Sequence, residues 1–152
     1  MATVATITGL LKIALGGIGG VDQASDEHYL PPVKTENVAL VIPPYGQQTS
    51  GVRQTATRGT WLLYHRIRCE FWVKLSSGAP ATAITYAREL GRSAIVALLT
   101  DATLNNANYQ VGFYGNNTPQ AIEADVTETP IVVGGMEFIV VSVIVPIVDY
   151  SG

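Results

Sequence analysis

The sequence predicts a single α+β domain with a mainly antiparallel sheet of four to five strands, an N-terminal helix and one long central helix packed on the sheet. Two patterns predict this fold class. Residues 64–75 alternate apolar and polar side chains with the period of two that is typical of a half-buried strand. From Pro80 onward, apolar residues recur every three or four positions over about 20 residues, as in an amphipathic helix. A chain of 152 residues can bury one sizeable core, so we expect one domain over residues 1–152.

An amphipathic helix is expected at the N-terminus, because apolar residues from Val4 to Ile18 follow one helical stripe. The apolar run of residues 3–21 is a poor membrane span, since Lys12 lies at its centre and four glycines lie near its end. No basic segment precedes this run, so a signal peptide is not expected either. We therefore expect the helix to dock on the core, with no part of the chain in a membrane.

A short apolar strand is predicted at residues 38–42, where Pro43 and Pro44 stop it. The next segment, from Tyr45 to Thr60, is rich in Gln, Thr, Gly and Arg and has little to bury. We therefore predict a long loop at about residues 45–60. Loops of this length inside small domains are usually functional or disordered.

The long strand at residues 64–75 has two different faces. Its odd positions, expected to face the core, carry Ile67, Cys69, Phe71, Val73 and Leu75. Its even positions, expected to face outward, carry Arg66, Arg68, Glu70, Trp72 and Lys74. A strand of this length spans about 40 Å. A domain of this size has a radius of gyration of roughly 15 Å, so the strand should cross nearly the whole body.

The C-terminal part of the chain is predicted to add strands to the sheet. A turn at residues 105–108 precedes a strand at residues 109–114, and residues 121–127 form a weaker strand candidate. Residues 136–148 are apolar on both sides, which indicates a strand covered on both faces. Pro146 cannot donate a hydrogen bond to a neighbouring strand, so that end is expected at an edge or a bulge.

Charge is unevenly distributed along the chain. Seven of the nine basic residues lie between Arg53 and Arg92 together with two acidic residues, whereas the rest of the chain holds two lysines and ten acidic residues. Separate basic and acidic patches suit head-to-tail association between identical subunits. Nucleic-acid binding by the basic region is an alternative, although a pI near 5.2 and the lack of a basic run argue against it.

The sequence offers little for catalysis, metal binding or cofactor binding. His28, beside Asp26 and Glu27, is interpreted as a solvated loop residue, and His65 as a satisfied residue at the start of a strand. Cys69 faces the core and is expected to be a buried, inert thiol in a reducing compartment. Residues 16–20 are glycine-rich but follow a helix and lack the lysine of a phosphate loop. We therefore predict that the protein is not an enzyme and has no catalytic, metal or cofactor site.

The outward face of the long strand is instead the best candidate for a protein interface, because Arg and Trp are enriched at interface hot spots, where one residue contributes roughly 2 kcal/mol or more. The alternatives are an ordinary solvated sheet face and a merely mobile loop. On this interpretation Arg68→Glu would leave the monomer folded and weaken assembly. The candidate interface residues are Tyr45, Arg53, Arg58, Arg66, Arg68, Trp72 and Lys74.

The order of these elements resembles the tail terminator family of long-tailed bacteriophages, over most of the chain. The matching features, in order, are the opening helix from Thr3 to Ile18, the strand running into Pro43-Pro44, the alternating strand introduced by His65, the helix carrying Ala83, Ala87 and Leu98-Leu99, and Gly134-Gly135-Met136-Glu137-Phe138 at the start of a long hydrophobic strand. The glycine-rich end of the first helix and the segment from Val21 to Asn37 depart from the pattern.

The resemblance implies a homo-oligomeric ring of six copies on the head-proximal end of the tail tube. Such a ring stops tube growth and joins the tail to the head connector or stopper protein, and DNA only passes through its lumen. It also implies a virion protein of the tail and neck, assembled in the host cytoplasm. A head-completion or stopper protein of the neck is the nearest alternative. A small-ligand-binding or enzymatic α+β domain is an alternative from a different class.

Overall fold

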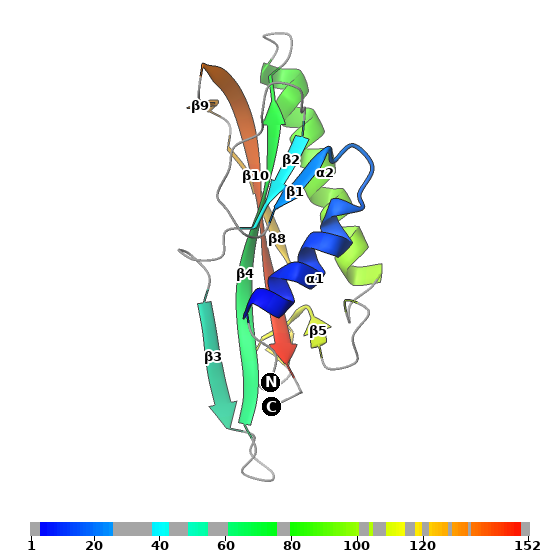
Figure 1. Cartoon of the computed structure of the whole chain (residues 1–152), viewed down its shortest axis with the longest axis vertical. Helices are drawn as coiled ribbons and strands as arrows, with labels where there is room; N and C mark the ends of the chain where they lie inside the picture. The colour runs from blue at the N-terminus through cyan, green and yellow to red at the C-terminus, as the bar shows by residue number, and fades with distance from the viewer. Residues whose placement is uncertain are drawn as a thin grey trace.

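The computed structural model of the protein describes residues 4–25, 38–42, 49–54, 61–75, 80–100, 104, 109–114, 118–119, 122–127, 129–133 and 135–149. Within these ranges the chain forms an α+β fold with two helices and a mixed sheet of eight strands (Figure 1). A separate pair of very short strands, β6 (Phe113–Tyr114) and β7 (Thr118–Pro119), lies outside that sheet. The predicted α+β class and both predicted helices are therefore confirmed.

Two long antiparallel strands form the centre of the sheet and run along the long axis of the molecule (Figure 1). They are β4 (Trp61–Lys74) and β10 (Met136–Asp149), of 14 residues each. Their register runs from Phe138 opposite Lys74 to Asp149 opposite Leu63. Strand β10 coincides with an apolar run and β4 with an alternating run. Both strands were therefore predicted from the sequence to within a few residues.

Shorter strands pair along the outer edges of this central ribbon. On β4 these are β2 (Val38–Val41), near its C-terminal end, and β3 (Thr49–Gln54), near its N-terminal end. On β10 they are β5 (Tyr109–Val111), β8 (Glu123–Val126) and β9 (Ile131–Val133). Strand β1 (Gln23–Ser25) pairs with β2 in parallel and makes the sheet mixed.

These pairings correct three expectations. Eight strands replace the expected four to five, because each 14-residue strand is long enough to pair with several short ones in succession. Part of the loop expected at residues 45–60 is strand β3, since backbone pairing does not require side chains that can be buried. The strand expected at residues 109–114 is interrupted at Gly112, whose φ of 90° is not a strand conformation.

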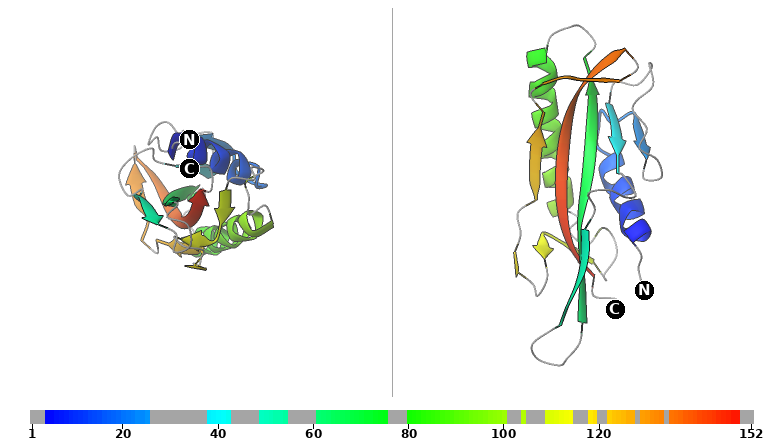
Figure 2. Two further views of the ribbon diagram at one scale, coloured as in Figure 1. Left: turned by 90° about the horizontal axis from the view of Figure 1, so that it is seen from below. Right: turned by 90° about the vertical axis from the view of Figure 1, so that its left-hand side faces the viewer.

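Both helices cover the same face of the sheet, as Figure 2 shows from two further directions. Helix α1 (Val4–Gly16) buries Ile7, Leu11 and Leu15, which are spaced four residues apart. Helix α2 (Pro80–Thr100) has the predicted start and length. Its buried side chains are those of Ala83, Ala87, Leu90, Ala94 and Leu98. Neither helix combines the length and the apolar character needed to cross a bilayer.

The long helix lies close to the sheet at Gly91. A Cβ atom at this position would come within 3.1 Å of both Ala124 Cβ on β8 and Val141 Cγ2 on β10. The missing side chain therefore allows the helix backbone to approach two strands at once. This contact fixes α2 over the β8 side of the sheet, while α1 lies over the β1 and β2 side (Figure 2).

Candidate protein interface

The faces of β4 follow the alternation seen in the sequence. Ile67, Cys69 and Phe71 are fully buried beneath the helices, so the predicted core face is confirmed. The opposite face is covered by neither helix, and we call it the helix-free face (Figure 2). It comprises Arg66, Arg68, Glu70, Trp72 and Lys74 of β4 with the even-numbered residues of β10 opposite them, from Phe138 to Pro146.

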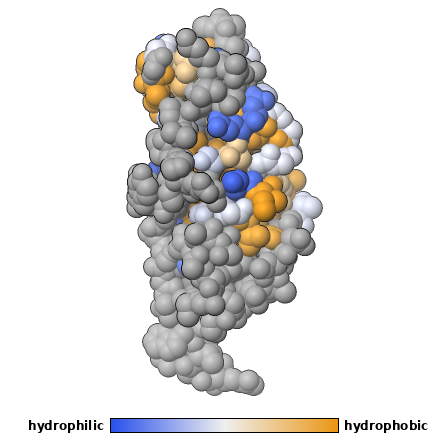
Figure 3. Space-filling view, viewed as in Figure 1, coloured by the Kyte–Doolittle hydropathy of each residue, from blue (hydrophilic) through white to orange (hydrophobic). Residues whose placement is uncertain are grey.

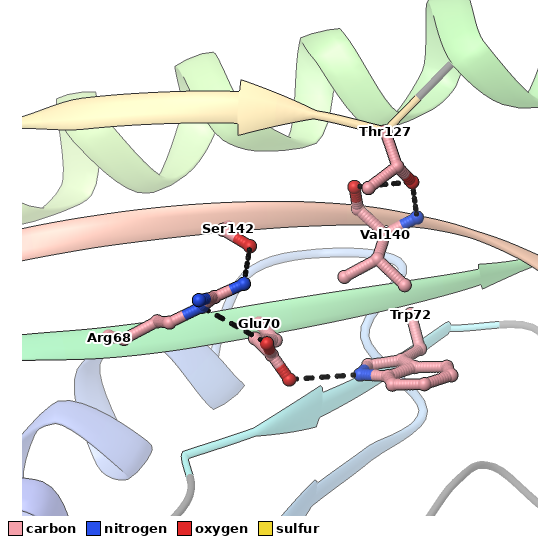
Figure 4. Close-up of polar contacts among 6 residues, drawn as sticks. All are labelled: Arg68, Glu70, Trp72, Thr127, Val140 and Ser142. Carbon is pink, nitrogen blue, oxygen red and sulfur yellow. Dashed lines mark hydrogen bonds and ion pairs between the residues drawn. The ribbon is translucent and has the colours of Figure 1, made fainter. Parts of the chain in front are cut away.

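A polar network crosses the middle of the helix-free face (Figure 4). Arg68 Nε lies 3.1 Å from Glu70 Oε2, and Arg68 Nη2 donates a 3.1 Å hydrogen bond to Ser142 Oγ. Trp72 Nε1 donates a longer hydrogen bond, 3.4 Å, to Glu70 Oε1. Burial of a carboxylate is costly unless it is paired. The Glu70 side chain is only 8% exposed, so its burial depends on the Arg68 guanidinium.

Trp72 belongs to a small second core on this face, and the expectation that it faces a partner must be revised. It is only 3% exposed. Its ring meets that of Phe138 edge-on, with centroids 5.6 Å apart. Val41 and Val140 complete the buried cluster, with Val133 and Met136 packed against it. The alternation of β4 gives the side of the sheet but does not say what covers that side. The signal was in β10, whose even positions are also apolar apart from Ser142.

The other candidate interface residues are placed as follows. Arg66 is exposed, while Arg68 and Lys74 are partly buried. Arg53 lies on strand β3, where only the backbone is described. Tyr45 and Arg58 lie outside the described residues. The structure thus brings Arg66, Arg68, Trp72 and Lys74 onto one face of one strand.

Two acidic residues that the sequence did not single out share the helix-free face. Glu123 of β8 lies opposite Ile144 of β10, which in turn lies opposite Arg68 of β4. Both Glu123 and Asp125 are exposed. Residues on β8 and β4 are separated by two strand spacings, about 10 Å. The face therefore has a basic strip on β4, an acidic strip on β8 and the half-buried Ile144 between them. The alternation of acidic and apolar residues at 123–126 was the signal for this arrangement.

The start of β4 forms a hairpin with β3 that extends past the end of β10. Toward its N-terminus, β4 pairs with β10 as far as Leu63. It pairs with β3 two residues further, as far as Trp61 opposite Gln54. Figure 1 shows the hairpin projecting from one end of the molecule. Among the described residues, the outer edge of β3 has no strand partner. An unpaired edge of this kind can add a strand from another chain.

The cysteine and histidine side chains of the described residues are buried in the fold. Burial raises the pKa of the Cys69 thiol well above its ordinary value, and the charge of Glu70 raises it further. The thiol is therefore protonated and shielded from reagents, as the sequence predicts. His65 is also buried. His28 lies outside the described residues, among which no three His, Cys, Asp or Glu side chains are grouped to hold a metal ion.

Comparisons with known proteins give no family. A scan against protein-family models and a search of curated proteins each returned no match. The tail terminator resemblance consequently remains a hypothesis that depends on the order of elements and on the surfaces described above.

Proposed function

We propose that this protein is a structural virion protein of the tail terminator kind. It forms a ring, with six copies as the resemblance implies, on the head-proximal end of the tail tube. The ring stops tube growth, binds the head connector or stopper protein, and lets DNA pass through its lumen. The observation that carries the proposal is the projecting β3–β4 hairpin, whose outer edge pairs with no strand of the described residues, in a sheet whose helix-free face has separate basic and acidic strips.

A ring needs two different surfaces on each subunit, because every contact in it is head-to-tail. The basic strip of β4, with Arg66 and Arg68, provides one surface. The acidic strip of β8, with Glu123 and Asp125, provides the other. Opposite charges on the two surfaces would favour one orientation of neighbouring subunits and disfavour like-to-like contacts.

The network around Arg68 suits such a contact. Its guanidinium is held by Glu70 and Ser142 before any partner arrives. Ordering a long side chain at an interface costs roughly 0.5–1.5 kcal/mol, and a side chain that is already held avoids part of this cost. Arg66, two residues away, is exposed and adds a second positive charge to the basic strip.

The oligomeric state of the purified protein is the first test. Sedimentation and negative-stain images should give a closed ring, alone or after addition of the tail tube protein. A chain that remains a monomer under both conditions would contradict the proposal. In the virus, loss of the protein should give tails of abnormal length that do not join heads. Tails of normal length that still join heads would refute the tail terminator assignment.

Localisation then separates the proposal from its nearest alternative. Labelled protein should appear at the junction, on the tail side of the neck. If the label lies on the head side and tails have normal length without the protein, it is a head-completion or stopper protein instead.

A further inference from the structure

One stripe along the outward side of α2 carries both charged and apolar side chains. Six residues on that side are all exposed and follow one another at intervals of three, four, three, four and three positions. This spacing is that of any single face of an α-helix, so a partner is indicated by the side chains that the stripe carries and not by the spacing. We call these residues the α2 seam: Thr82, Thr85, Glu89, Arg92, Val96 and Leu99. None of them belongs to the buried core.

The C-terminal end of the seam is apolar and strongly exposed. Val96 is 55% exposed and Leu99 is 60% exposed. On the neighbouring helix, Ile13 of α1 is 74% exposed. In the space-filling view, hydrophobic residues reach the surface on the side where Figure 1 places the helices (Figure 3). The helix layer therefore presents apolar side chains in addition to charged ones.

The seam is complementary to itself when it is read in the opposite direction, because its intervals are the same from either end. In an antiparallel pair of α2 helices, Glu89 of one copy meets Arg92 of the other, and the reverse pair forms as well. Thr85 meets Val96 and Thr82 meets Leu99, so each exposed aliphatic side chain meets a threonine methyl group. All six positions are matched, and the two ion pairs are repeated by a two-fold axis.

From this charge complementarity we infer that a second copy of this chain packs on the α2 seam, as an antiparallel two-fold contact. Two shallow hollows along the seam can receive side chains of the second helix. One is lined by Thr82, Thr85 and Glu89 with Ala81 and Tyr86, and the other by Glu89, Arg92 and Val96 with Ser93 and Ala97. The contact uses the helix layer and leaves the helix-free face available, so it is independent of the proposed ring contact.

The contact should be weak. A helix of 21 residues is about 30 Å long, and one helix pair buries less than the roughly 800 Å² per partner of a standard interface. We expect a dissociation constant on the order of micromolar, measured by sedimentation over a concentration series.

Charge exchange between two variants tests the inference. Glu89→Arg places two basic side chains on the seam, and Arg92→Glu places two acidic ones there. Each variant alone should pair about tenfold or more weakly than the wild type, because both ion pairs become repulsive. An equimolar mixture of the two should pair again, since both charge contacts between the two helices are then between opposite charges. Failure of the mixture to recover pairing would overturn the inference, as would pairing of the single variants at wild-type strength.

Two controls keep the result interpretable. Glu137→Arg reverses an exposed charge outside both the α2 seam and the helix-free face, and it should leave α2 pairing unchanged. Thermal unfolding of each variant shows whether the monomer is still folded. A Thr85→Cys variant mixed with a Val96→Cys variant should form a mixed disulfide if the register is right, and buried Cys69 should not compete. A disulfide between Val96→Cys and Leu99→Cys variants instead would overturn the proposed register.

The same measurements in an Arg66→Glu background separate this inference from the proposed function. That substitution should abolish rings but leave two-fold pairs. Pairs without rings in the wild type would refute the ring and retain the inference. Rings in the wild type, with no two-fold pairs in the Arg66→Glu background at any concentration measured, would refute the inference and retain the ring.

Discussion

Removal of the Arg68 guanidinium, as in Arg68→Met, should destabilise the monomer more than any other single loss of surface charge on the helix-free face. Methionine keeps most of the apolar stem but leaves the Glu70 carboxylate without its 3.1 Å ion pair. Ser142 loses the donor of its hydrogen bond as well.

The magnitude lies between two limits. Removing one partner of a fully buried ion pair costs about 3–5 kcal/mol, whereas a surface pair contributes about 0–1 kcal/mol. The Glu70 side chain is 8% exposed but that of Arg68 is 29% exposed, so solvent screens part of the interaction. We expect a loss of about 2 kcal/mol in the free energy of unfolding, measured by urea denaturation with an unchanged slope.

A double-mutant cycle with Glu70→Gln isolates the pair. The double variant should be more stable than the sum of the two single losses predicts. Arg66→Met is the matched control, because Arg66 is exposed on the same face and the interactions of an exposed charge contribute at most about 1 kcal/mol. Equal losses for Arg68→Met and Arg66→Met, with no coupling to Glu70, would refute the reasoning. The same geometry revises the expectation for Arg68→Glu, which would place two carboxylates together and weaken the monomer as well as its assembly.

Three further predictions concern buried residues. Ile67→Asp should abolish folding, because Ile67 is fully buried and the new charge has no partner. The measurement is the loss of a cooperative unfolding transition. A soluble, cooperatively folded variant would mean that the strand faces are reversed. Trp72→Ala should cost about 3–5 kcal/mol in urea unfolding by emptying the site beside Phe138, and a loss below about 1 kcal/mol would show that Trp72 is not a core residue. Cys69 should resist thiol reagents in the native protein and react on unfolding. Because its pKa is raised only in the folded state, protonation of this thiol stabilises the fold fully below the ordinary pKa of 9.0 and progressively less as pH rises above it. Rapid labelling of the native protein at pH 8 would contradict the burial of Cys69.

The long elements could be predicted from the sequence because their patterns are local. The alternation at residues 64–75 and the helical spacing after Pro80 each extend over several repeats, and both elements lie where they were expected. The apolar run of β10 correctly indicated cover on both faces. Such patterns show which side of a helix or strand is buried, and they are visible in consecutive residues of the chain.

The strands expected at residues 38–42, 109–114 and 121–127 overlap β2, β5 and β8. Strand β3, the order in which the short strands pair and the acidic strip could not be predicted, because they depend on partners far away in sequence. Strand β3 is polar and is defined by pairing with β4. Strand β8 alternates acidic and apolar residues, but only its register against β10, which the sequence does not give, brings Glu123 onto the face of Arg68. Trp72 was expected outside for the same reason, since its cover comes from Phe138 on a strand more than sixty residues later.

An image of the assembled particle at side-chain resolution would test the central claim most directly. We expect a closed ring in which Arg66 and Arg68 of each subunit approach Glu123 and Asp125 of its neighbour, with the β3–β4 hairpin in contact with another protein chain. A ring in which all four side chains face solvent, or particles in which the protein remains a single copy, would contradict the account.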